Sequence, residues 1–359
     1  MNVDAKKRIL WWGRNGNYGP NYPRNRTIIQ CLKSFEHEVI EYQPHFSKLG
    51  DIEARFRNFG SIDFVWVPCF RQRDISAASR WAKMKKIPLI FDPLISAYDK
   101  RVYEKKKYSP ESIRAKKLLS WEKKRFSLAD IIIADTECHK QYFFKQLGCH
   151  KNKLKVIPVS AEEALFYPKV TKQNEIPEVL FFGTFIGLQG PKFIAEAIQH
   201  YKGPPIKLVF LGDGAERDQC KTVVQQKGNK NVSVQFEEWI PFHDLPERIR
   251  RADICLGIFG LGEKSHRVIP NKVYQALACG KPVITLISDA YPAELLKQEN
   301  QGIIFCEAGN PKSIASSILK LITLIEQNRY DLTSPRSIYD LYFSNEVIKN
   351  QLFEIIKNV

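Results

Sequence analysis

The stretch Val268–Thr285, VIPNKVYQALACGKPVIT, carries the strongest local signals for the fold. Pro270 has a backbone dihedral suited to the first turn of a helix, and Gly280 is of the residue type that most often ends one. We expect a helix over Asn271–Cys279, followed by a strand that returns to a sheet. Free backbone amides at the start of this helix, aided by its dipole, would form a site for an anion such as a diphosphate. An ordinary helix with a proline start and a glycine stop is the alternative.

Short β-branched or aromatic runs alternate with helix-length segments on both sides of this stretch, which is typical of parallel sheets covered by helices. In the first half the predicted strands are Arg8–Trp12, Glu38–Tyr42, Asp63–Val67, Leu89–Phe91, Ile131–Ala134 and Leu154–Ile157. Helices are predicted between them at Arg24–Phe35, Asp74–Met84, Glu111–Ser127 and Thr136–Leu147. In the second half the predicted strands are Val179–Phe182, Lys207–Leu211, Val232–Phe236, Ile254–Ile258, Pro282–Leu286 and Gly302–Phe305.

Both halves therefore have the pattern of Rossmann-like domains, joined by the polar stretch Ser160–Pro177. Two such sheets would place the carboxyl ends of their strands, where these folds bind ligands, on either side of one cleft. The predicted fold class is α/β, with two doubly wound domains facing a central cleft. The expected bounds are residues 1–165 for the first domain, 166–340 for the second and 341–359 for a last helix.

Composition excludes several other classes. The chain has 359 residues, of which 44% are hydrophobic and 26% charged, so disordered, collagen-like and coiled-coil proteins fit poorly. No stretch reaches the length of a membrane span or of a signal peptide, and we expect a cytoplasmic protein. The eight cysteines include no C-x-x-C pair, which argues against a zinc site or a disulfide framework. No metal site is expected.

The net charge of +16 lies entirely in residues 1–160, because the remaining residues balance. Residues 83–125 alone hold fourteen basic and five acidic side chains. Within the predicted helix Glu111–Ser127, a spacing of seven puts four lysines on one face: Lys116, Lys117, Lys123 and Lys124. We expect this face to bind an anionic membrane peripherally, on the inner face of the cell membrane. A merely solvated face is the alternative, and no motif supports nucleic acid as a partner.

Several segments, in one order along nearly the whole chain, resemble glycosyltransferase family 4, the retaining GT-B enzymes of the "glycosyl transferases group 1" type. They are the run ACGKPVI, the upstream LPERIRRADICLGIFG, the VFLGDG turn, the FGTFIGLQG loop and VIPVSAEEALFYP. The resemblance implies a nucleotide-sugar donor held by the second domain and an acceptor held by the first. It also implies a last helix, Ser344–Lys357, that crosses back onto the first domain.

The chain departs from that family at four donor positions. Thr184 and Gln189 stand where an arginine and a lysine are usual, and Arg267 and Gln275 stand where two glutamates are usual. A departing diphosphate needs its charge neutralised, so other cations must reach the same point. Arg267, His266 and Lys272 flank the predicted phosphate helix and are the candidates, Arg267 and Lys272 as catalytic groups. Gln275 can still bond a ribose hydroxyl, and Glu263 is a candidate for the missing sugar-facing acid.

Other loops complete the expected donor site. Gly183 would let the backbone approach the phosphates, Thr184 would donate a hydroxyl, and Gly212 is a weaker candidate because a lone Gly-x-Gly is often only a turn. The stretch EEWIPFHDLPE resembles the family's base-binding loop, with Trp239 and Ile240 near the base, although Trp239 would serve equally well in the core. The start of the phosphate helix adds Val268, Ile269, Pro270 and Asn271.

On the acceptor side, the loop GRNGNYGPNYPRNR follows the first predicted strand. Its glycines do not have the dinucleotide spacing, which excludes a nicotinamide site. Gly16, Gly19 and Arg24 are instead candidates for a loop that closes over the reacting groups, as the resemblance implies. Asp92 or Asp99, in FDPLISAYD, would hold the proton that the acceptor hydroxyl loses, whereas a turn cap is the other interpretation of Asp92.

These features predict a retaining, metal-independent glycosyltransferase of the hexosyl type that needs no cofactor. Its donor would be a UDP- or GDP-sugar, and its acceptor a sugar or lipid-linked glycan of the cell envelope. The departures at Thr184, Gln189 and Gln275 keep open a second class, a catalytically weak nucleotide-sugar binding protein on the same fold.

Overall fold

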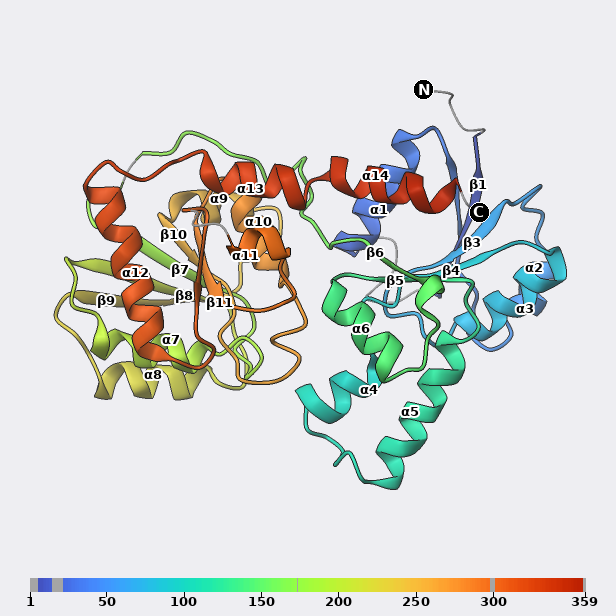
Figure 1. Ribbon diagram of the computed structural model, residues 1–359, viewed down its shortest axis with the longest axis horizontal. Coiled ribbons are helices and arrows are strands. Elements are labelled where there is room, and N and C mark those ends of the chain that lie inside the picture. Colours follow the sequence, from blue (N-terminus) through green and yellow to red (C-terminus); the bar gives the residue numbers. More distant parts are fainter. Residues whose placement is uncertain (1–5, 15–21, 173, 298–300, 358–359) are drawn as a thin grey trace. The chain divides into compact units, whose positions relative to one another are not determined.

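The chain folds into two compact units, Met1–Ser160 together with Asn345–Val359, and Ala161–Ser344 (Figure 1). The computed structural model describes residues 6–14, 22–172, 174–297 and 301–357. Each unit is built on one six-stranded sheet in which every strand pair is parallel. The chain enters the second unit after Ser160 and returns to the first unit with its last helix.

The sheet of the first unit has the strand order β2-β1-β3-β4-β5-β6. The strands are β1 (Arg8–Trp12), β2 (Glu38–Tyr42), β3 (Phe64–Val67), β4 (Leu89–Phe91), β5 (Ile131–Ala134) and β6 (Leu154–Val156). The helices are α1 (Pro23–Ser34), α2 (Gly50–Arg55), α3 (Ile75–Lys85), α4 (Ala97–Asp99), the π-helix η1 (Lys100–Glu104), α5 (Ile113–Phe126), α6 (Glu137–Lys145), the 3-10 helix η2 (Lys151–Lys153) and α14 (Asn345–Ile356).

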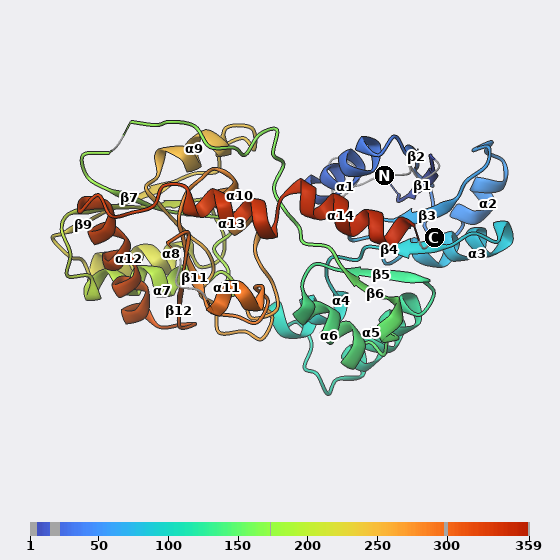
Figure 2. The ribbon, with the colours of Figure 1, turned by 45° about the horizontal axis from the view of Figure 1, so that its top comes forward.

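Helices cover both faces of this sheet because alternate strand residues are apolar on both sides. One core holds Leu10 and Trp12 of β1 with residues of α2, α3, α5 and α6, among them Trp81 and Phe126. The other core packs α1 and α14 against the opposite face, and Figures 1 and 2 show these two helices side by side. The last helix therefore completes the first unit.

The sheet of the second unit has the order β12-β11-β10-β7-β8-β9. Its strands are β7 (Glu178–Phe182), β8 (Ile206–Leu211), β9 (Val232–Glu237), β10 (Ile254–Leu256), β11 (Val283–Leu286) and β12 (Ile303–Cys306). Its helices are α7 (Pro191–Ala197), the 3-10 helix η3 (Ile198–His200), α8 (Arg217–Gln226), α9 (Leu245–Arg251), α10 (Asn271–Ala278), α11 (Ala293–Lys297), α12 (Pro311–Glu326) and α13 (Ser334–Tyr342).

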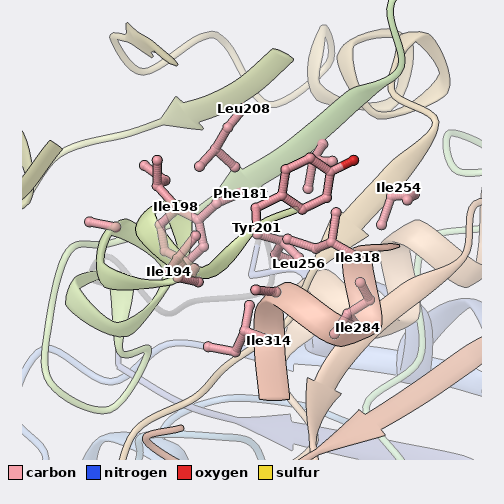
Figure 3. Packing of buried hydrophobic residues seen from close by; sticks show 14 of the residues in the cluster. Phe181, Ile194, Ile198, Tyr201, Leu208, Ile254, Leu256, Ile284, Ile314 and Ile318 are labelled. Carbon is pink, nitrogen blue, oxygen red and sulfur yellow. The ribbon is translucent and has the colours of Figure 1, made fainter. Parts of the chain in front are cut away.

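The main core of the second unit joins its sheet to α7 and α12 (Figure 3). Phe181 and Leu208 of neighbouring strands meet Ile194 of α7 and Ile314 and Ile318 of α12, and all five are almost fully buried. This packing holds the strands rigid, so the loops at their carboxyl ends start from defined positions.

The two doubly wound sheets confirm the predicted fold class, and each predicted strand is found within a residue or two of its expected bounds. In the first unit the short helices α2, α4, η1 and η2 were not predicted. In the second unit α10 is the one helix whose bounds were predicted. Seven of the eight cysteines are buried free thiols. Within the described residues, no helix has both the length and the apolar character needed to cross a bilayer.

Candidate functional site

Two glycines bring the loops after β7 and β8 into contact at the carboxyl edge of the second sheet. The amide of Gly183 donates to the carbonyl of Leu211 (3.0 Å), and the amide of Phe185 donates to that of Asp213 (2.9 Å). Gly212 has a φ of +124°, and a Cβ there would overlap the carbonyl oxygen of Gly183 and lie 3.2 Å from the ring of Trp239. Only glycine fits this conformation and this approach. The glycines of FGTFIGLQG and LGDG therefore serve a close approach of backbones.

The rest of the β7 loop packs against the loop that follows β10. The amide of Phe259 donates to the carbonyl of Gln189 (3.0 Å), and the Ser265 hydroxyl donates to that of Leu188 (3.3 Å). Gly190, at a φ of +65°, has the amide of Gly260 within 2.8 Å of the position that a Cβ would take. These contacts place three loops of the second unit around the start of α10.

Helix α10 begins as the sequence predicts, with an extended Pro270 before Asn271, and its first turn carries a buried lysine. Lys272 is 6% exposed, and its ammonium donates to Oε1 of Gln189 at 2.6 Å. The ammonium also lies 3.8 Å from the ring centroid of Phe181, and a Cβ on Gly183 would come within 2.8 Å of it. Gln189 occupies a loop position where the family that this sequence resembles usually has a cationic side chain. Here Lys272, from α10, brings a cation to that position instead.

The environment of Lys272 is unfavourable for a charge. Burial lowers the pKa of Lys272 well below its usual value. An ammonium has three donor protons, and Gln189 is its one hydrogen-bond acceptor among the described residues. A bound anion at this point would offset the burial cost and satisfy the remaining donors. The arrangement is therefore suited to holding a phosphate group against the glycine loop.

Arg267 and Glu263, which were expected to serve the phosphate and the sugar, bond to each other. The guanidinium of Arg267 donates to Glu263 at 3.0 Å, and the glutamate side chain is 71% exposed. The side chain of His266 is exposed, and its carbonyl accepts from the Ser288 hydroxyl at 2.6 Å. Lys272 is therefore the only one of the three candidate cations that reaches Gln189 among the contacts of the described residues.

The other candidates for the donor site differ in exposure. Trp239 is 51% exposed, so it lies at the surface beside Gly212 rather than in the core. Thr184 and Asn271 are exposed, and Val268 and Ile240 are partly so. Two candidates are buried: Ile269 and Gln275.

In the first unit, three acceptor-side candidates lie in the interior. The Arg24 guanidinium donates to both oxygens of Asp92, at 2.9 and 3.2 Å, and to the carbonyls of Ile157 and Pro158. Arg24 and Asp92 are each 1% exposed, and Asp99 is fully buried. All three side chains are enclosed by protein in this structure, and their expected contact with an acceptor stays a prediction.

Gly16 and Gly19, the remaining acceptor-side candidates, lie outside the described residues. The structure adds one polar pair that the sequence reading missed at the carboxyl end of β5. Asp135 binds the Nδ1 of His139, and both side chains are almost fully buried. A D-x-x-x-H spacing directly after a strand, with a threonine that caps the helix, was the available signal.

The lysine face of α5 is arranged as the seven-residue spacing predicts. Its four lysines are exposed, whereas Leu118, Leu119 and Phe126 pack inward. Glu122, fully buried on the inner side, accepts from the Ser96 hydroxyl and from the amides of Ala97 and Tyr98. This carboxylate therefore fixes the basic helix to the loop after β4.

Comparison with known proteins concerns the donor site of the second unit, because the matched region contains all the loops around the start of α10. Residues 176–324 match the family described as glycosyl transferases group 1. The matched region spans β7 to α12 and so includes the glycine loops and the first turn of α10. A probable glycosyltransferase of Pseudomonas aeruginosa, WbjE, is 26% identical over 220 residues, which is 57% of this chain and about half (49%) of the relative's length.

Solved structures show that the whole chain has the GT-B fold of glycosyltransferases. HepE of Anabaena, solved in complex with UDP, has a TM-score of 0.69 at 15% identity, covering 98% of this chain and 100% of that one. Sucrose-phosphate synthase of Thermosynechococcus elongatus has a TM-score of 0.72 at 15% identity, covering 98% and 99%. At this identity the likeness establishes the fold alone, and the function of the loops must be judged from their own residues.

Proposed function

We propose that the protein is a glycosyltransferase that moves a sugar from a nucleotide-diphosphate donor to an acceptor hydroxyl, with retention of anomeric configuration. The observation that carries this proposal is the buried Lys272 ammonium at the start of α10, against Gln189 and the β7 glycine loop. The match of the surrounding residues to the glycosyl transferases group 1 family supports the same reaction.

The chemistry of the donor explains why a cation is needed there. When the glycosidic bond breaks, the nucleotide diphosphate leaves with additional negative charge, which must be stabilised as it develops. Lys272 supplies a positive charge from the helix that also offers free backbone amides at Asn271 and Lys272. We expect the half-exposed ring of Trp239, beside Gly212, to stack on the nucleobase.

Nucleotide binding is tested first with a thermal-shift panel of UDP, GDP, TDP and ADP on the full chain. A ligand that binds only the folded state raises the melting temperature by mass action. We expect UDP or GDP to give the largest shift, and HepE structures with UDP and UDP-glucose favour UDP as the first choice. No shift with any of the four nucleotides would contradict the proposed donor site.

Retention and metal independence are tested with the donor that the panel selects. We expect slow donor hydrolysis in the presence of a chelator, and NMR of the first-formed sugar to show the anomer of the donor. Inversion of configuration, or loss of turnover on chelation, would contradict that part of the proposal.

The acceptor side of the proposal is a lipid-linked or other cell-envelope glycan, reached by docking on the inner face of the membrane. It rests on the exposed lysine face of α5 and on the positive charge of the first half. The wild type is expected to sediment with phosphatidylglycerol vesicles at low salt. Changing the four lysines to glutamate should remove most of the salt-sensitive part of this binding and leave donor hydrolysis intact. Equal binding of both proteins would contradict docking through this face.

A nucleotide-sugar binding protein without useful turnover is the second candidate, favoured by the family positions that lack their usual charges. These positions are Thr184, Gln189, Arg267 and Gln275. Binding of nucleotide without hydrolysis of any donor, or transfer to any acceptor, would support this candidate against the enzyme.

A further inference from the structure

A short segment of the first unit exposes an unusual set of large apolar side chains. Phe46 is 63% exposed, Leu49 50%, Ile52 48% and Phe56 87%. Spacings of three, three and four residues place them along one side of a helical turn. The hydrogen bonds support this, because the amide of Leu49 donates to the carbonyl of Phe46 (3.0 Å) and that of Ile52 to Leu49 (2.9 Å). We call these four residues the apolar ridge.

The apolar ridge runs along the outer side of α2 and of the turns on both sides of it, because only Ile52 of the four lies within the helix. The inner side is already packed. Ala54, 2% exposed, lies in the core beneath the helix, and the Tyr42 hydroxyl donates to the carbonyl of Gly50 at 2.7 Å. A Cβ on Gly50 would lie 3.1 Å from the ring of Trp12. A surface helix normally turns its large apolar residues inward and its charges outward. Here the small residues face the core and the large ones face solvent, so the ridge is an unpartnered surface.

The surface around the apolar ridge carries more basic than acidic side chains. Both acidic side chains of this segment are bound within the fold: Asp51 by Arg80 (2.5 Å), and Glu53 by the His45 ring (3.0 Å). Exposed basic side chains remain in the same segment and on the neighbouring helix α3, and they are Lys48, Arg55, Arg57, Lys83 and Lys85. Figures 1 and 2 both show α2 beside α3.

We infer that the apolar ridge inserts into the head-group boundary of an anionic bilayer, with the surrounding cations bound to lipid phosphates. Apolar side chains surrounded by basic ones are the chemistry of helices that lie in a membrane interface. The helices α2 and α5 contribute to the core on the same face of the sheet, so the ridge and the lysine face of α5 belong to one helical layer. This inference rests on the membrane docking of the proposed function, and it adds a contact that salt does not screen.

Salt separates the two contributions. At about 1 M salt the Debye length falls to about 3 Å, so attraction between lysines and anionic lipid is largely lost, whereas burial of apolar side chains persists. The wild type is expected to bind phosphatidylglycerol vesicles strongly at low salt and to keep a measurable bound fraction at about 1 M salt. Complete release of the wild type at high salt would overturn the inference without any variant.

The test variant is F46S/F56S, which removes the two most exposed rings of the ridge. Because each ring contributes apolar area to the buried contact, the partition coefficient should fall at least about tenfold, and the salt-resistant fraction should disappear. The matched control is L332S/L341S, which removes two apolar side chains of the second unit that are 78% and 66% exposed. The control should bind as the wild type does. Equal binding of F46S/F56S and wild type at both salt concentrations would overturn the inference.

Two further measurements identify the occupant of the ridge. Analytical ultracentrifugation reports self-association: a wild-type dimer that F46S/F56S converts to a monomer would assign the ridge to a second copy and overturn the membrane assignment. The nucleotide thermal shift is measured on the same proteins and should be equal in all of them. Loss of vesicle binding with an unchanged thermal shift supports the inference, and absence of the thermal shift in the wild type concerns only the donor site.

Discussion

The change Lys272→Met tests the donor site most directly, because it removes one buried charge and keeps a side chain of similar length. An ammonium donating to a diphosphate is a charge-assisted hydrogen bond worth about 1.5–3 kcal/mol, so the Kd for the nucleotide should rise by about ten- to a hundredfold. If the ammonium also stabilises the leaving group, kcat for donor hydrolysis should fall by about 10²–10³. Calorimetric binding and steady-state kinetics measure the two effects.

The stability of the ligand-free protein should also depend on the charge of Lys272. Burial lowers the pKa of Lys272, so the unfolded chain holds this proton more tightly than the folded one. The stability of the wild type should therefore increase as the pH rises from the folded pKa toward the ordinary lysine value, and Lys272→Met should lose this increase. Each unit of difference between the folded and unfolded pKa values of Lys272 changes the free energy of unfolding by about 1.4 kcal/mol. Urea unfolding across this range measures it.

Proton uptake provides a third result for the same position. A bound diphosphate would restore the charge of Lys272, so nucleotide binding should take up a proton where the free lysine is partly neutral. Calorimetry in buffers of different ionisation enthalpy detects this. Lys281→Met, which removes a partly buried lysine just beyond the end of α10, is the matched control and should bind and turn over as the wild type does. Unchanged affinity and kcat in Lys272→Met would refute the reasoning.

Three other substitutions test separate parts of the structure. Arg267→Ala should lower turnover by less than about tenfold, since its guanidinium is paired with an exposed carboxylate; a hundredfold loss in steady-state kinetics would return the catalytic role to it. Asp92→Asn leaves the Arg24 charge buried and should reduce the free energy of unfolding by about 3–5 kcal/mol. Glu38→Gln, in an exposed pair, is the control and should change the urea midpoint far less. Gly212→Ala should abolish the nucleotide thermal shift, because a Cβ there overlaps the backbone of the neighbouring loop. Gly228→Ala, whose Cβ would lie 3.5 Å from its nearest neighbour, should keep the shift, and equal shifts would contradict the role of the glycine contact.

Local patterns were sufficient for the architecture of this protein. Strands such as β1 and β11 consist of apolar runs, and α10 begins after Pro270 and ends before Gly280, so their bounds depend on residues close in sequence. The seven-residue spacing of the α5 lysines likewise determines one exposed face, since helix geometry alone relates those positions. Segments of one or two turns, such as α2, carry too little periodicity to be recognised.

Tertiary structure decided which of the candidate side chains meet. Arg24 and Asp92 lie 68 residues apart and neutralise each other in the interior, and Lys272 reaches Gln189 over 83 residues. No sequence spacing expresses either contact, because each depends on where the sheet brings the ends of its strands. Burial is also decided by tertiary structure, because α2 turns Gly50 and Ala54 toward the core while Phe46 and Phe56, on either side of the helix, stay in solvent. The sequence by itself therefore determined the elements and the chemistry available, and packing determined which side chains remain accessible to a ligand or a membrane.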